Sequence, residues 1–286
     1  MKWTNILLLV LLGAIWGSSF LFLRIVTPVV GATLTMSIRI VFAAGVMLIL
    51  FGYLKQLPDY KVYWKQYFIL GVLNLVLPFT LISYSISNLN ASVGAILNAT
   101  TPLFTMIISS WWLKEKMSFK KIVGIMVGLA GLIILVGWIP FDLTGKVIIS
   151  VVSSLLASFS YGVGAVYTKV YLRNAQPLKT ATGQMSAAAL LVVPLMYNPA
   201  SMEAFNITIL IVVLILAVFC TALAYGLYFQ LITNIGSTNT SLVTLLVPVF
   251  SLLWGKIFLD EPLTPAIVIG LALILGSLKL VLSPAK

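Results

Sequence analysis

The sequence predicts an all-α membrane protein with ten transmembrane helices arranged as two inverted five-helix repeats. Of its 286 residues, 61% are hydrophobic and only 8% are charged, which leaves too little charge for the surface of a soluble protein of this size. Apolar runs of about 20 residues recur along the whole chain, and each is long enough to cross ~30 Å of hydrocarbon as a helix. In addition, a proline-centred segment of the first half is repeated without gaps in the second half.

The predicted spans follow one another with short connections. They lie near residues 5–24, 34–53, 67–87, 91–113, 121–138, 147–168, 179–197, 207–231, 237–258 and 265–282. One of the two shortest, 121–138, has Lys120, Lys121 and Trp138 at its ends, which suit helix ends at the membrane interface. The first run follows a single Lys2 and lacks a small-residue cleavage site. It continues to Arg24, so we expect a retained span rather than a signal peptide.

The repeat is clearest in the fourth and fifth spans of each half. NLNASVGAILNATTPLFTMIISSWWLKEKMSFKKIVGIMVGLAGL, from Asn88, aligns with NIGSTNTSLVTLLVPVFSLLWGKIFLDEPLTPAIVIGLALILGSL, from Asn234. The alignment places Pro102 on Pro248 and Glu115 on Glu261, and a weaker match places Arg24 on Lys169 and Arg39 on Gln184. Because each half holds an odd number of spans, the second copy must lie upside down. The expected halves are residues 1–140 and 141–286, and inverted repeats around a midplane site are typical of secondary transporters.

Basic residues set the predicted orientation. The net charge of +11 would suggest a nucleic-acid partner in a soluble protein, but here it follows the positive-inside rule and no nucleic acid is expected. With the N-terminus inside, the outer side holds little beyond Arg24, Lys146 and Lys256. The inner side collects Lys2, Lys55, Lys61, Lys65, Lys114, Lys116, Lys120, Lys121, Lys169, Arg173, Lys179, Lys279 and Lys286. Both termini are therefore expected in the cytoplasm, for a multi-pass protein of a bacterial inner membrane.

Several motifs resemble one transporter family. They are GAIWGSSF with Arg24 behind it, RIVFAAG at Arg39, S-x-G-A-I-x5-P-L-F followed by LKEKMSFKKIVGIMVGLAG, and their counterpart in the second half. Together they are similar to the EamA family of the drug/metabolite transporter superfamily. The resemblance implies ten helices in two inverted repeats and transport, usually export, of small metabolites. One departure is that the first helix has no membrane-embedded carboxylate of the kind that related small multidrug proteins use. Trp16, Ser18 and Ser19 stand there instead, which argues against cationic-drug antiport.

Three prolines within spans each follow a polar residue by four positions. The pairs are Asn74/Pro78, Asn98/Pro102 and Thr244/Pro248. Proline removes the hydrogen bond to the carbonyl four residues earlier, and a freed carbonyl in lipid needs protein, water or a ligand. Each pair would therefore place a loose carbonyl beside a polar side chain near the midplane, as a site for a small polar solute. The alternative is that these are ordinary kinks whose polar residues bond neighbouring helices.

Aromatic residues within spans are further candidates for substrate binding. Trp16, Tyr161, Tyr225 and Tyr228 lie within spans rather than at interfaces, and Ser19 lies one helical turn from Trp16. A buried Tyr or Trp needs a partner for its polar atom, so these residues are candidates for the lining of a wet cavity. Simple packing is the alternative for each of them.

Charged residues in or beside spans are candidate gates or mouth charges. A central Arg costs ~2.5–3.5 kcal/mol on insertion scales, so Arg39 should face a cavity or a partner. One hypothesis is that Arg24 and Arg39 attract a carboxylate-bearing solute at the outer mouth and Lys169 does so inside, with snorkelling as the alternative. Glu115 and Glu261 follow the fourth and ninth spans at opposite membrane faces, where we expect structural caps, with gating or proton acceptance as alternatives.

The sequence thus favours a transporter over an enzyme. It contains no metal-ligand cluster, nucleophile–base constellation or phosphate-binding loop, so no cofactor or metal is expected. We expect export of amino acids or similar small metabolites by alternating access around a central cavity lined by spans one, three, four, six, eight and nine. The alternatives are efflux of apolar drugs or lipid-like solutes, and a membrane assembly protein that carries no flux. Expected partners are the small-molecule substrate and membrane lipid, in a monomer or alternatively a homodimer.

Overall fold

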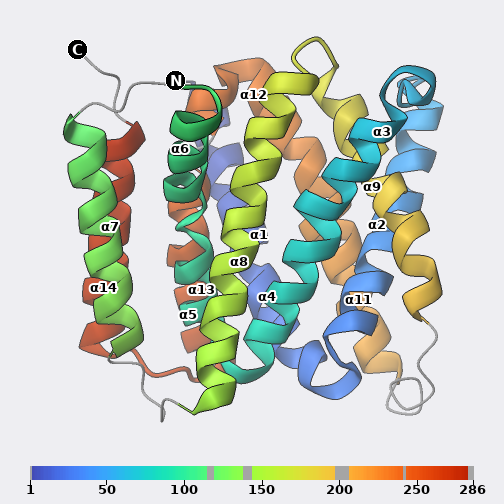
Figure 1. The fold of residues 1–286 in the computed structure, drawn as a ribbon. Coiled ribbons are helices and arrows are strands. Elements are labelled where there is room, and N and C mark those ends of the chain that lie inside the picture. Colours follow the sequence, from blue (N-terminus) through green and yellow to red (C-terminus); the bar gives the residue numbers. More distant parts are fainter. Residues whose placement is uncertain (1, 115–118, 138–143, 197–205, 241–242, 283–286) are drawn as a thin grey trace.

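The computed structural model describes residues 2–114, 119–137, 144–196, 206–240 and 243–282. Within these ranges every regular element is a helix (Figure 1). The elements are α1 (Trp3–Val30), α2 (Ala32–Tyr53), α3 (Tyr60–Gly71), η1 (Val72–Val76), α4 (Leu77–Asn88), α5 (Ala91–Asn98), α6 (Thr101–Trp112), α7 (Phe119–Gly137), α8 (Gly145–Tyr171), α9 (Pro177–Val192), η2 (Val193–Met196), α11 (Ile207–Ala217), η3 (Val218–Leu223), α12 (Ala224–Thr240), α13 (Val243–Leu259) and α14 (Pro265–Leu282).

Many of these helices are long and apolar enough to cross a membrane. The described residues hold six such stretches, at 3–30, 32–53, 60–88, 91–112, 145–171 and 207–232, and three shorter apolar helices at 122–134, 243–259 and 265–277. The chain is therefore an all-helical, multi-pass membrane protein. α9 and η2, which cover residues 179–196 of the predicted span 179–197, are not among these nine stretches, so the count of ten spans stays a prediction.

Several predicted helix boundaries differ from the structure. α1 continues to Val30, beyond the expected end at 24, and α3 begins at Tyr60, before the expected start at 67. We expected the ninth span to begin at 237, but α12 continues to Thr240 and α13 begins at Val243. The Nδ2 of Asn234, near the end of α12, donates a hydrogen bond to Oδ1 of Asn5 in α1 at 3.1 Å. This contact holds the last turns of α12 against α1, a tertiary effect that local sequence does not reveal.

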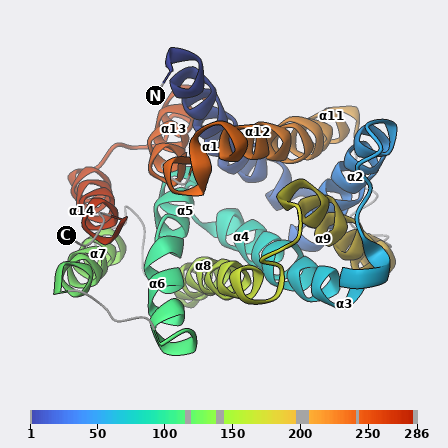
Figure 2. The same cartoon turned by 90° about the horizontal axis from the view of Figure 1, so that it is seen from above.

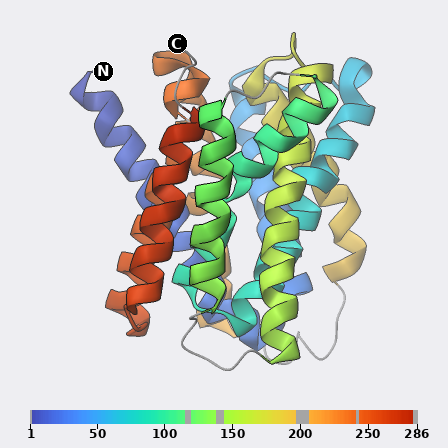
Figure 3. The ribbon, with the colours of Figure 1, turned by 60° about the vertical axis from the view of Figure 1, so that its left-hand side comes forward.

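The helices run up and down across one bundle. The beginning of α1 and the end of α14 lie at the same end of the bundle in two views (Figures 1 and 3). Seen from above, α7 and α14 pack on each other as a pair set beside the remaining helices (Figure 2). α1 and α2 are separated by the single residue Gly31, whose φ of 81° favours glycine. The Gly31 N–H donates to the Thr27 carbonyl, which closes α1.

Two π-helical segments interrupt the third and eighth predicted spans. η1 lies just before Pro78, and η3 lies between α11 and α12. The alignment that places Asn88 on Asn234 also places the first residue of η1, Val72, on the first residue of η3, Val218. Hydroxyl groups satisfy backbone carbonyls at both irregularities. Thr80 donates to the Val76 carbonyl at 2.6 Å, and Thr221 donates to the Leu216 carbonyl at 2.9 Å.

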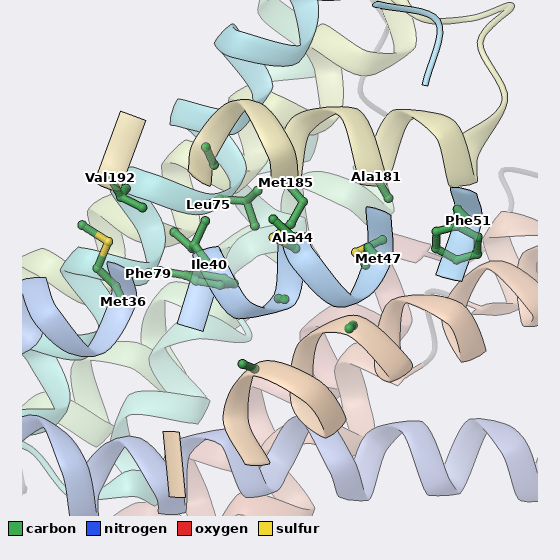
Figure 4. Packing of buried hydrophobic residues seen from close by; sticks show 14 residues of the cluster. Met36, Ile40, Ala44, Met47, Phe51, Leu75, Phe79, Ala181, Met185 and Val192 are labelled. Atoms are coloured by element: carbon green, nitrogen blue, oxygen red, sulfur yellow. The ribbon is translucent and has the colours of Figure 1, made fainter. Parts of the chain in front are cut away.

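A buried apolar cluster joins helices from both halves of the sequence. Met36, Ile40 and Met47 of α2 pack with residues of η1, α4 and α9 (Figure 4). Leu75 and Met185, from η1 and α9, are fully buried there. α2 and η1 are thereby held against α9, which belongs to the second half of the chain.

Close approach of α1 and α13 depends on small residues. A Cβ atom at Gly13 would lie 2.6 Å from Cβ of Leu246, and one at Gly17 would lie 2.9 Å from the backbone nitrogen of Ser251. These distances are shorter than van der Waals contact, so the helix backbones approach each other in the manner of small-xxx-small pairs in membranes.

A buried carboxylate joins the two halves at one end of the bundle. Glu261, in the connection between α13 and α14, is 5% exposed. It accepts hydrogen bonds from the backbone N–H groups of Ala91 at 2.6 Å and Ser92 at 3.1 Å, and from the Ser92 hydroxyl. These are the first residues of α5, where a negative charge is favoured by unpaired N–H groups and the helix dipole.

We predict that Gly17→Ala destabilises the protein and that Gly45→Ala does not. The added methyl group at Gly17 would push α1 away from α13, and overpacking of this kind costs about 1–3 kcal/mol. A Cβ atom at Gly45 in α2 meets nothing within 4 Å, and alanine is favoured over glycine within a helix. Thermal unfolding of the detergent-purified variants checks this, and equal melting temperatures for the two would contradict the close packing described.

The neighbouring acids Glu261 and Asp260 provide a second prediction. Glu261→Gln should lower the free energy of unfolding by about 1.5–3 kcal/mol, because it removes the charge from hydrogen bonds that a carboxylate accepts. Asp260 is exposed, and the hydrogen bond from Lys256 lowers the pKa of its carboxyl group. Asp260→Asn removes the same charge at the surface and should leave the melting temperature nearly unchanged. Equal losses in both variants would show that Glu261 does not act through α5.

Candidate functional site

A cavity of about 300 Å³ lies among the helices. This volume is at the lower end of the range for ligand pockets and suits a small solute. The lining comes from α1, α2, α4, α5, α6, α8, η3, α12, α13 and the turn between α5 and α6. The described residues that line it are Trp16, Ser19, Phe20, Leu23, Arg39, Phe79, Ile82, Ala95, Asn98, Ala99, Thr101, Pro102, Tyr161, Cys220, Tyr225, Tyr228, Thr244, Val247 and Pro248.

The cavity brings together many of the residues that the sequence singled out. The same six predicted spans supply its walls, and α2 adds Arg39. Its lining includes Trp16, Ser19, Arg39, Asn98, Pro102, Tyr161, Tyr225, Tyr228, Thr244 and Pro248. Five other predicted residues, Asn74, Pro78, Arg24, Lys169 and Glu261, are not part of this lining. Glu115 lies outside the described residues.

The fourth predicted span is broken where it meets the cavity. α5 ends at Asn98, and α6 begins at Thr101 with Pro102 in its first turn. The Asn98 carbonyl, which Pro102 leaves without its helical donor, accepts a hydrogen bond from the Thr101 hydroxyl at 2.8 Å. Ser158 of α8 also donates to this carbonyl, at 3.4 Å. The freed carbonyl expected from the sequence is therefore satisfied within the protein.

The side chain of Asn98 is in a different situation from its carbonyl. Its Oδ1 atom is buried and has no hydrogen-bond partner among the described residues. The Ser19 hydroxyl, also on the lining, has none in the same part of the chain. A buried polar atom without a partner is costly, so both oxygens are places where a bound solute would gain a hydrogen bond.

The other two proline pairs differ from each other. Asn74 of η1 donates from Nδ2 to Oε1 of Gln184 in α9 at 2.9 Å and packs closely on Gly164 of α8. Asn74 thus serves contacts between helices, which was the alternative interpretation for these pairs. Pro248 lies inside α13, which continues through it, and both Pro248 and Thr244 face the cavity.

Aromatic rings form one wall of the cavity. The ring centroids of Trp16 and Tyr228 are 5.3 Å apart, and those of Trp16 and Tyr225 are 6.4 Å apart with the rings nearly perpendicular. Such separations give favourable edge and offset contacts. Trp16 thus packs against its neighbours and lines the cavity at the same time, and the two interpretations of the sequence do not exclude each other.

Arg24 and Arg39, which were both expected to attract a solute at the outer mouth, lie in different surroundings. Arg39 is buried, with 7% exposed, and its Nε donates to Oγ1 of Thr221 in η3 at 2.9 Å. Its guanidinium carbon lies 4.0 Å from the ring centroid of Phe79. Arg24 donates instead to the carbonyls of Ile86 and Ser87 at the end of α4, at 3.2 and 3.1 Å. Arg39 therefore faces the cavity rather than snorkelling, while Arg24 closes a helix end.

The remaining predicted charges serve elsewhere. Glu261 holds the start of α5, as described above, and Lys169 lies in the last turn of α8. The sequence analysis did not identify nine described lining residues, which are Phe20, Leu23, Phe79, Ile82, Ala95, Ala99, Thr101, Cys220 and Val247. Phe20 and Leu23 fall on the same helical face as Trp16 and Ser19, so helical periodicity could have found them. Phe79, Ile82 and Cys220 carry no comparable signal, because only packing between helices turns them toward the cavity.

Known proteins resemble this chain over nearly its whole length. It is 24% identical to the uncharacterized transporter YoaV of Bacillus subtilis, covering 91% of this chain and 90% of that protein. It is 29% identical to protein PecM of Dickeya dadantii, covering 93% and 88%. One solved crystal structure shares the fold with a TM-score of 0.65 at 17% identity, covering 95% of each chain. The sequence profile of the EamA-like transporter family matches twice, at residues 3–137 and 148–283. The chain therefore belongs to the EamA-like transporter family and is a membrane transporter.

Proposed function

We propose that the protein exports amino acids or similar small metabolites across the cytoplasmic membrane by alternating access. The observation that carries the proposal is the buried, unpartnered Oδ1 of Asn98, which lines the cavity where α5 and α6 meet. Transporter sites are commonly built at the broken helices of a repeat near the midplane. A small polar solute bound there would supply the hydrogen bond that the protein leaves unmade.

The proposed architecture is a pair of inverted five-helix repeats with both termini in the cytoplasm. Two matches of one family profile support it, as do the two π-helical segments at aligned positions. Two hydrogen bonds also cross between the halves and join corresponding elements. Gln184 of α9 accepts from Asn74 of η1, and Arg39 of α2 donates to Thr221 of η3. In each case the second predicted span of one half contacts the π segment of the other, as expected for pseudosymmetric halves.

Efflux of apolar drugs or lipid-like solutes is the second candidate function. The aromatic wall formed by Trp16, Tyr225 and Tyr228 favours it, because large rings provide apolar contact area. The oxygens of Ser19 and Asn98 oppose it, since an apolar solute would bury them without a partner. We therefore rank a polar solute first.

We predict that Asn98→Ala strongly reduces transport. Wild type in liposomes loaded with a pooled panel of amino acids and metabolites should show saturable counterflow. The variant should lose about tenfold or more of it, because an interaction with a polar solute in a water-poor cavity is lost. Asn88→Ala is the control, since Asn88 contacts Ser87 and Ser150 and is not on the cavity lining. Absence of counterflow from folded wild type, or equal flux in both variants, would contradict the proposal.

Substitutions of Asn98 and Thr244 distinguish a carrier of polar solutes from a carrier of apolar solutes. A polar-solute carrier should lose most of its activity in both Asn98→Ala and Thr244→Ala, because each removes a polar group from the lining. A carrier of apolar solutes should keep or gain activity, because each change makes the cavity more apolar. Flux of a fluorescent apolar dye, measured beside amino-acid counterflow in the same liposomes, distinguishes the two. Dye flux that survives both substitutions while counterflow is absent would establish the second candidate.

A further inference from the structure

Arg39 is the one charged residue among the described residues that line the cavity. It is buried in α2, and a cation within a membrane span is unfavourable unless it meets a partner or a polar cavity. No carboxylate in the described ranges forms an ion pair with Arg39. The ion pairs found there join Lys179 to Asp59 and Lys256 to Asp260. The protein therefore places a positive charge against the cavity without an anion of its own beside it.

Arg39 contacts the described part of the protein through its Nε and one face of its guanidinium group, but not through its two terminal amino groups. Nε donates to Thr221, and one face of the guanidinium group covers the ring of Phe79. Neither terminal amino group makes a hydrogen bond with any residue of the described chain. These two groups form the end of the planar fork, the edge that binds a carboxylate through two parallel hydrogen bonds. Thr221 and Phe79 thus fix the orientation of the fork while that edge remains available.

The other polar groups of the lining are uncharged. The buried Oδ1 of Asn98 is an acceptor, and the buried Ser19 hydroxyl can accept or donate. No Asp or Glu lies on the described lining. A hydroxyl or ammonium group next to a carboxylate can donate to Asn98 Oδ1. A free amine without a carboxylate would instead bring a second positive charge into a cavity that already holds Arg39.

We propose that Arg39 is the carboxylate-binding residue of the cavity and that the transported solute must carry a carboxylate group. This inference rests on the proposed function, which assigns transport to this cavity, and it narrows the substrate class. Amino acids and their deaminated analogues satisfy the requirement, whereas amines of the same carbon skeleton and neutral apolar drugs do not.

Binding to the purified protein in detergent tests this requirement directly. Three pools are built on the skeletons of valine, leucine, methionine and phenylalanine: the amino acids, the deaminated acids and the decarboxylated amines. At neutral pH both carboxylate pools should raise the melting temperature of the wild-type protein, and the amine pool should not. The members that stabilise the protein then provide individual dissociation constants by titration calorimetry.

Three substitutions test whether carboxylate binding needs the planar guanidinium fork of Arg39 or only a positive charge. Arg39→Gln should weaken carboxylate binding by about tenfold or more, because a charge-assisted bidentate contact is lost. Arg39→Lys keeps the charge without the fork, so an intermediate loss is expected. Lys256→Gln removes an exposed positive charge away from the cavity and should leave the dissociation constants within about twofold of wild type. If Arg39→Gln does not fold, Arg39→Met replaces it, as an apolar side chain of similar length.

The outcomes distinguish this inference from the proposed function. Undiminished carboxylate binding in Arg39→Gln, amine binding as tight as carboxylate binding, or no binding of any pool by folded wild type would overturn the role of Arg39. Counterflow in liposomes is measured in parallel. If flux is unchanged in Arg39→Gln, the proposed carboxylate site is contradicted, while the proposed transport function is not. If carboxylate binding depends on Arg39 but the protein moves no solute, the binding site is confirmed and the proposed transport function is contradicted.

Discussion

The need to satisfy every backbone hydrogen bond inside hydrocarbon governs this structure. Helices meet that need by themselves, so irregular backbone is tolerated only where protein or a cavity supplies partners. Three departures from regular helix within the spans of the described chain are η1, η3 and the turn between Asn98 and Thr101. In each place a Thr hydroxyl donates to a backbone carbonyl. Local sequence thus provides the partners that allow the helices to deviate, and the break at Asn98 and the segment η3 both border the cavity.

Much of the architecture follows from sequence because it depends on composition and repetition. Apolar runs predicted where most of the helices lie, because a span needs about 20 apolar residues to cross the hydrocarbon. They did not predict how far α1 and α3 extend beyond those runs. The boundary near 237 was predicted wrongly, because the contact between Asn234 and Asn5 joins residues that are distant in the chain. A hydropathy pattern indicates where a helix is apolar, but it does not indicate which neighbour holds its end.

The cavity was predictable to a different extent for different residues. Proline and polar residues at fixed spacing pointed to Asn98 and Thr244, because the backbone consequence of proline is local. The same spacing also pointed to Asn74, which the fold uses to contact Gln184. Arg24 and Arg39 look alike in the sequence, yet one closes the end of α4 and the other faces the cavity. Local sequence patterns identify polar groups that need a hydrogen-bond partner. Packing between helices then decides whether the protein or a solute supplies that partner.

Arg39 connects two features that would otherwise be separate. Its Nε bonds Thr221, and Thr221 in turn bonds the Leu216 carbonyl at the irregular backbone of η3. The guanidinium group therefore lies between the cavity and a segment whose hydrogen bonding already departs from the α-helical pattern. Single π-helical turns inside α-helices occur frequently at functional sites. If Arg39 binds the solute as proposed, the same side chain contacts both the solute and η3, which belongs to the other half of the chain.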